Sequence, residues 1–136
     1  LLSFTLIGNT LIKRNWRLAG NYLITLLGFA LVVYGIMFID NRFQYWPALG
    51  LDYSTHTAVS LALTSFLIMT AKEFWSVWLV SLVCYYVLML YQEYHSMADI
   101  VTTVLACGVF LAPIAISSIR FSSQLCNPVS SNEVQD

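Results

Sequence analysis

The chain has 136 residues, 59% of them hydrophobic and only 10% charged, and its mean hydropathy is +0.74. Soluble domains usually carry about 25% charged residues, so this composition excludes an ordinary soluble domain and favours a protein that lipid surrounds. The formal net charge is -1, and the charged residues are scattered in short polar segments. Because of this scatter, the net charge says nothing about acidic or basic partners, and no nucleic-acid partner is predicted.

Five apolar segments follow one another along the chain, at residues 1–12, 18–39, 56–71, 74–91 and 97–119. A helix needs about 20 apolar residues to cross a hydrocarbon core of about 30 Å. The first segment is too short and begins at Leu1 rather than at a methionine, so we expect it to be the end of a truncated span. Ser54 suits the N-cap of the third segment. The sequence predicts an all-α, polytopic transmembrane helical bundle of about four to five spans.

The polar segments predict how the bundle is oriented and where it ends. Basic residues cluster at positions 13–17, which the positive-inside rule places in the cytoplasm. Alternation then places residues 40–55 and 92–96 outside, and the turn at 72–73 and the residues after 119 inside. Residues 1–119 are expected to form one transmembrane domain, and residues 120–136 a polar, disordered tail.

Both histidines of the chain, His56 and His95, fall on the predicted non-cytoplasmic face. Asp99 follows His95 by four residues, which places the two side chains on one side of a helix. A carboxylate that accepts a hydrogen bond from one imidazole nitrogen fixes the tautomer and leaves the other nitrogen as a nucleophile or base. His56 would then be the general acid for a departing alkoxide. The alternative is that His95 and Asp99 form only a structural contact at a helix start.

The surroundings of these histidines suit a phosphate group. Two helix N-termini direct unpaired N–H groups and positive dipole ends toward the same space. Ser54, Thr55, Thr57 and Arg42, the only basic residue on this face, are the predicted substrate contacts. Phosphoryl transfer through a phosphohistidine fits these groups best and needs no metal, so no metal or cofactor is predicted. A facial triad of the two histidines and Asp99 is the metal-binding alternative.

Two short motifs resemble the type 2 phosphatidic acid phosphatase superfamily. The run Asp52-Tyr53-Ser54-Thr55-His56-Thr57 is similar to the second motif of that family, Pro-Ser-Gly-His, and His95-Ser96-Met97-Ala98-Asp99 is similar to the end of the third, a His followed four residues later by Asp. The resemblance spans about residues 40–119. It implies a helical membrane enzyme acting on lipid phosphates or diphosphates, with His95 as nucleophile, Asp99 as its orienting partner and His56 as acid.

The chain departs from the family pattern at several positions. Tyr53 and Thr55 replace the Pro and Gly of the second motif, and Leu88 and Met89 stand where the third motif has Ser-Arg. The first motif, a Lys followed seven residues later by Arg-Pro, is absent from the sequence. Most of the cationic phosphate clamp is therefore missing. The sphingomyelin synthase-like phosphotransferases, a related group, keep a His, His, Asp triad without the full clamp, and the two motifs resemble that group as well.

The sequence thus predicts a membrane-embedded lipid phosphate phosphatase that works through a phosphohistidine on the non-cytoplasmic face, with the lipid bilayer and a lipid phosphate as its partners. Two alternatives stay open. The first is a lipid head-group phosphotransferase, in which a second lipid rather than water accepts the phosphorylated group. The second is a catalytically silent relative that binds lipid head groups, which the missing clamp favours.

Overall fold

The computed structural model describes residues 16–126, and within that range its regular elements are all helices. In chain order they are α2 (Trp16–Phe43), α3 (Tyr45–Ala48), α4 (Thr55–Thr70), the 3-10 helix η1 (Lys72–Phe74), α5 (Trp75–Tyr91) and α6 (Met97–Cys126). The expected truncated span at residues 1–12 and the part of the expected tail from residue 127 onward lie outside the described residues.

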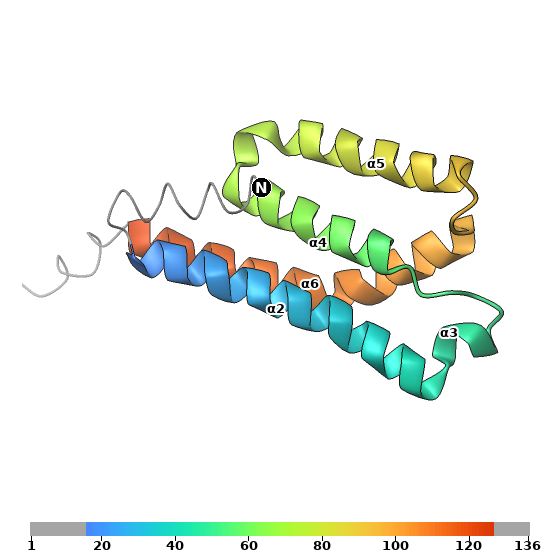
Figure 1. Cartoon of the computed structure of the whole chain (residues 1–136). Coiled ribbons are helices and arrows are strands. Elements are labelled where there is room, and N and C mark those ends of the chain that lie inside the picture. Colours follow the sequence, from blue (N-terminus) through green and yellow to red (C-terminus); the bar gives the residue numbers. More distant parts are fainter. Residues whose placement is uncertain (1–15, 127–136) are drawn as a thin grey trace, which may run out of the picture.

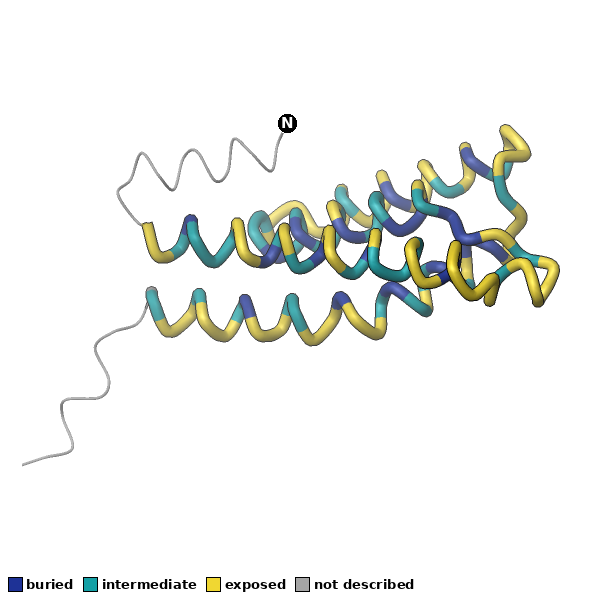
Figure 2. Tube along the Cα trace, turned by 60° about the horizontal axis from the view of Figure 1, so that its bottom comes forward, coloured by how far each residue is buried: buried dark blue, intermediate teal, exposed yellow. Residues whose placement is uncertain are grey.

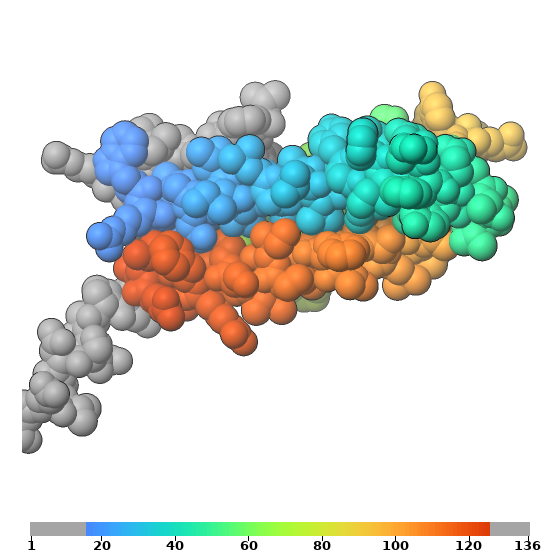
Figure 3. Space-filling view, turned by 90° about the horizontal axis from the view of Figure 1, so that it is seen from below, coloured from blue at the N-terminus to red at the C-terminus, as the bar shows by residue number. Residues whose placement is uncertain are grey.

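The four long helices run alternately in opposite directions (Figure 1). The helices α2, α4 and α6 pack against one another, whereas α5 lies at the edge of the bundle and packs mainly on α4. Figure 3 shows α2 and α6 side by side along one face of the molecule. Because helices that follow one another in the chain alternate in direction, the end of α2, the start of α4, the end of α5 and the start of α6 lie at one end of the bundle (Figure 1).

Among the described residues, three segments are long and apolar enough to cross a membrane, namely Trp16–Phe43, Lys72–Tyr91 and Met97–Leu125. Only 17%, 11% and 22% of their most apolar 18-residue windows are buried inside the protein, so most of that apolar surface needs lipid to cover it. With 16 residues, α4 is shorter, about 24 Å at 1.5 Å per residue. The fold class predicted from composition, an all-α membrane helical bundle, is confirmed.

The helix bounds follow the apolar segments closely except at the C-terminal end. The predicted N-cap is confirmed, because the Ser54 Oγ accepts a hydrogen bond from the Thr57 N–H at 3.2 Å. The last helix continues to Cys126, so the first seven residues of the predicted disordered tail are helical. Polar contacts with α2 explain this extension: the Asn21 amide donates to the hydroxyls of Ser118 and Ser122 at 2.8 and 2.9 Å.

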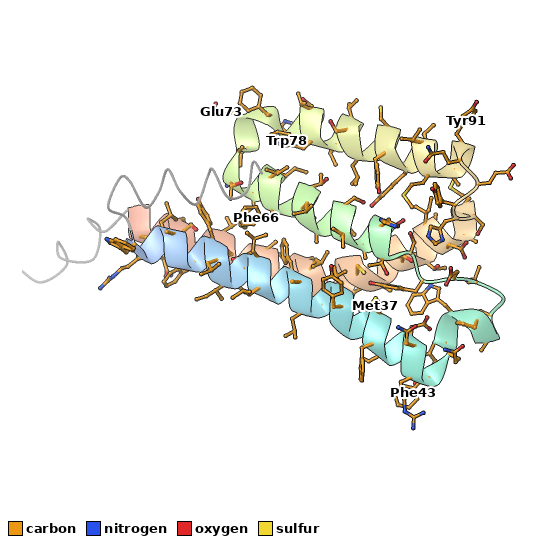
Figure 4. All side chains as sticks on the ribbon, viewed as in Figure 1. Met37, Phe43, Phe66, Glu73, Trp78 and Tyr91 are labelled. Carbon is orange, nitrogen blue, oxygen red and sulfur yellow. The ribbon has the colours of Figure 1, made fainter. Side chains whose placement is uncertain are left out.

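The core lies where α2, α4 and α6 meet. Its most buried large side chains are Phe29 and Val33 of α2 and Phe66 of α4, with Cys107 of α6 beside them. Figure 2 shows that buried positions recur along the inner side of these helices, and Figure 4 shows Phe66 between α4 and α2. Tyr53 reaches this core from the segment before α4, and its hydroxyl donates to the Val33 carbonyl at 3.0 Å. Burial, above all, raises the pKa of the Tyr53 hydroxyl, so this donor stays protonated.

Candidate catalytic site at the histidine end of the bundle

Both histidines lie at the end of the bundle where α2 and α5 finish and α4 and α6 begin; we call it the histidine end. His56 is the second residue of α4, and His95 lies two residues before α6. The two segments that carry the motifs are therefore neighbours in space because of the alternating helix directions (Figure 1). The shared end that the sequence predicted for the two histidines is thus found in the fold.

The Asp99 carboxylate joins the two motif segments through their backbones. Its Oδ1 accepts a hydrogen bond from the Asp52 N–H at 2.8 Å, and its Oδ2 accepts from the Ser96 N–H and hydroxyl, both at 2.8 Å. The Asp99 N–H in turn donates to the Ser96 Oγ at 3.2 Å. Ser96 and Asp99 thus form a capping box at the start of α6. The hydrogen bond from the Asp52 N–H holds the segment before α4 against the start of α6.

These contacts correct the expected partnership of Asp99 with His95. Asp99 is 7% exposed, and within residues 16–126 its carboxylate accepts hydrogen bonds from Asp52 and Ser96, none of them from an imidazole. His95 lies near enough to Asp99 for an electrostatic interaction. The sequence pattern of His, three residues, Asp also contains Ser, two residues, Asp, which is a capping box. The Asp99 carboxylate therefore caps the start of α6, whereas the motif had predicted a hydrogen bond from His95.

Two of the three predicted hydroxyl contacts are engaged inside the bundle. Ser54 and Thr57 are fully buried, and the Thr57 hydroxyl donates to the Ser54 Oγ at 2.8 Å. The Ser54 N–H donates to the Thr103 hydroxyl at 3.2 Å, which ties the N-cap of α4 to α6. Ser54 and Thr57 therefore position the start of α4 and do not face an accessible site. Thr55, the first residue of α4, is half-buried.

His56 is exposed and borders a cavity of about 250 Å³ between the start of α4 and the end of α5. Tyr94, the neighbour of His95, borders the same cavity, but His95 itself does not. Leu88 and Met89 are also in its wall. These are the two positions that the resemblance matches to the Ser-Arg of the third motif, and here their apolar side chains line the cavity.

Arg42, a predicted substrate contact, is not among the residues that line this cavity. It belongs to the last turn of α2, and its guanidinium lies 6.0 Å from the centre of the Phe43 ring. Figure 4 shows Phe43 pointing outward from the free side of α2. Arg42 is exposed. The face of an aromatic ring attracts a guanidinium, and a long basic side chain keeps its charged end in water.

The histidine end is acidic, a feature that the motif comparison did not reveal. Asp40, Asp52, Glu93 and Asp99 lie there, and Arg42 is the only Lys or Arg of the described residues at this end. Asp40 is 5% exposed, and its carboxylate accepts a hydrogen bond from the Trp46 N–H at 2.8 Å. This contact fixes the turn after α2. In the sequence, the polar pair Asp40-Asn41 at the end of an apolar run is the feature that indicates this turn.

Within residues 16–126, no group of three or more His, Cys, Asp or Glu side chains is arranged to hold a metal ion.

The fold and the site together define an all-α bundle with membrane-compatible helices and two histidines at one end. Comparison with protein-family models, with curated proteins and with solved structures gave no match.

Proposed function

We propose that this protein is a membrane-embedded lipid phosphate phosphatase, related to the type 2 phosphatidic acid phosphatase superfamily, that works through a phosphohistidine. One observation carries the proposal: Asp99 ties the segment that leads into His56 to the turn that carries His95. Two imidazoles on short segments joined in this way suit a phosphate held between them. The apolar wall of the His56 cavity suits a lipid substrate better than a soluble one.

In this mechanism the two histidines divide the chemistry. An imidazole nitrogen of His95 attacks phosphorus, so that an N–P bond forms while the P–O bond to the lipid alcohol breaks. His56 donates a proton to the departing alkoxide. Water then attacks phosphorus and gives a proton to His56, the N–P bond to His95 breaks, and inorganic phosphate leaves. Asp99 is a positioning residue here, because it acts on the backbone of the turn after His95.

The membrane orientation forms part of the proposal. We place the histidine end on the non-cytoplasmic side of a multi-pass protein. Arg17, Lys72 and Arg120, at the opposite end of the bundle, support this orientation, because basic residues gather on the cytoplasmic side. Single-cysteine variants at Glu93 and Glu73, probed with a membrane-impermeant thiol reagent in intact cells, test it. Labelling at residue 93 and none at residue 73 is the expected result, and the reverse pattern would contradict the orientation.

Phosphate release from purified protein tests the activity directly. Phosphatidic acid and a lipid diphosphate are supplied in mixed micelles, with or without diacylglycerol or ceramide as acceptor. We expect His95→Ala and His56→Ala to reduce release by a factor of at least about 100, the size that loss of a nucleophile or general acid has. Tyr94→Phe, a cavity neighbour without a role in proton transfer, is the matched control. Equal release by wild type and His95→Ala would refute the nucleophile assignment.

A second candidate is a catalytically silent relative that binds lipid head groups. The specific observation in its favour is the wall of the His56 cavity, where Leu88 and Met89 stand at the positions expected for cationic phosphate contacts. An apolar wall can hold a lipid without supplying the charge that stabilises a phosphoryl-transfer transition state. Retention of lipid phosphates by wild-type protein, with no release of phosphate or transfer of label to an acceptor lipid, would favour this candidate over the enzyme.

A further inference from the structure

A second cavity lies at the opposite end of the bundle from the histidines. Its volume is about 510 Å³, and it is lined by the start of α2, the turn from α4 through η1 into α5, and the end of α6. The turn is the left end of α4 and α5 in Figure 1. Small-molecule pockets measure roughly 300–1,000 Å³, so this cavity is large enough for a ligand that the histidine chemistry does not involve.

Two opposite charges border this cavity next to each other. Lys72 and Glu73, consecutive residues of η1, both line it and are both exposed. Figure 4 labels Glu73 at this turn. Within residues 16–126 neither residue takes part in a salt bridge. The cavity therefore presents one uncompensated cation and one uncompensated anion to a ligand.

Two serine hydroxyls of α6 extend this pair of charges. The Ser122 Oγ accepts a hydrogen bond from the Asn21 amide at 2.9 Å, which leaves its own proton available as a donor. The Ser123 hydroxyl donates to the Arg120 carbonyl at 2.8 Å, which leaves its lone pairs available as acceptors. The wall thus holds donors and acceptors in addition to the two charges.

Several apolar side chains complete the wall, and the length of α2 indicates that the cavity lies at the level of lipid head groups. Leu18, Met69 and Ile119 are among its lining residues. With 28 residues, α2 is about 42 Å long, which exceeds a hydrocarbon core of about 30 Å. Both ends of α2 therefore reach the head-group region. A ligand there has its polar part at the turn and its apolar part along the helices.

We propose that this cavity binds a phospholipid with a phosphoethanolamine head group. The phosphate oxygens accept hydrogen bonds from the Lys72 ammonium and the Ser122 hydroxyl. The primary ammonium of the lipid donates to the Glu73 carboxylate and the Ser123 hydroxyl. The acyl chains lie along the apolar part of the wall. Each charge of the zwitterion meets its opposite, and every bond to a charged group is of the stronger, charge-assisted kind.

The arrangement predicts selectivity among lipid head groups. A choline head group carries its positive charge on a quaternary nitrogen, which has no N–H to donate to Glu73. A glycerol head group has no cation at all, and its phosphate alone would lie beside the carboxylate. The ethanolamine head group is the one of the three that satisfies both Lys72 and Glu73. Substitution of Glu73 should therefore change the preference among head groups, and substitution of Lys72 should lower the affinity for all phospholipids.

Native mass spectrometry of the full chain, released from detergent with equimolar phosphatidylethanolamine and phosphatidylcholine of the same acyl chains, tests the proposal. We expect wild type to retain the ethanolamine lipid about tenfold more than the choline lipid, the size of one charge-assisted hydrogen bond. Glu73→Gln should bring this ratio close to one, and Lys72→Gln should lower retention of both lipids. Soluble phosphoethanolamine at equal concentration should displace neither lipid.

Two matched controls lie at the histidine end, Glu93→Gln and Arg42→Gln, since they remove the same charges from other exposed positions. Both should behave as wild type. Equal retention of the two lipids by wild type would overturn the proposal. So would a loss of selectivity in Glu93→Gln as large as that in Glu73→Gln, or displacement of the lipid by soluble phosphoethanolamine.

Discussion

Exchange of Asp99 for alanine should destabilise the whole histidine end of the bundle. The substitution removes the acceptor of three hydrogen bonds, two of them from the backbone N–H groups of Asp52 and Ser96. An unsatisfied buried donor costs about 1–3 kcal/mol, and loss of a helix cap costs about 1 kcal/mol. Because these terms overlap, we expect the free energy of unfolding to fall by about 2–4 kcal/mol.

Tryptophan fluorescence during heating in detergent measures this effect, since the chain has four tryptophans. At about 4 °C per kcal/mol for a chain of this size, the unfolding temperature of Asp99→Ala should fall by about 8–16 °C. Asp52→Ala is the matched control, because its carboxylate is exposed and its contact with Asp99 uses only the backbone N–H. The control should stay within about 0.5 kcal/mol of wild type. Equal unfolding temperatures for the two variants would refute the role given to Asp99.

Four further substitutions test other contacts. Tyr53→Phe removes the hydrogen bond to the Val33 carbonyl and should lower the free energy of unfolding by about 1 kcal/mol, measured by the same heating experiment. Asn21→Ala removes the amide that holds the end of α6; amide hydrogen exchange at residues 120–126 should become at least about fivefold faster, and unchanged exchange would contradict the explanation of that helix extension. Arg42→Gln should leave phosphate release unchanged, because Arg42 does not line the His56 cavity and its guanidinium lies beside the Phe43 ring. Leu88→Lys places a cation in that cavity and should lower the KM for lipid phosphate several-fold; a higher KM would argue against phosphate binding there.

The fold class and the helix bounds followed from the sequence because they depend on short-range properties. An apolar run long enough to cross a bilayer specifies a helix almost without regard to its neighbours, and the Ser54 cap depends on residues three apart. The end of α6 did not follow in the same way. Its polar final turns are stabilised by Asn21, which lies 97 and 101 residues away along the chain from Ser118 and Ser122.

The candidate site was predictable only in part, because its residue types fit more than one role. The alternation of helices placed His56 and His95 at one end, as expected from the order of the spans. The hydrogen-bond partners of Asp99 were not predictable in this way. Asp99 lies four residues after His95 but also three residues after Ser96, which is the spacing of a capping box. Ser54 and Thr57 likewise satisfy each other at a helix start, which a motif alone does not distinguish from contact with a substrate.

The central claim is that His95 forms a covalent bond to phosphorus. Brief incubation of the purified protein with phosphatidic acid labelled in its phosphate, followed by alkaline denaturation, tests this most directly, because phosphohistidine survives base and is lost in acid. We expect label on wild-type protein that is stable to base and labile to acid, and no label on His95→Ala. Phosphate release by wild type without any such label, or equal labelling of His95→Ala, would contradict the claim.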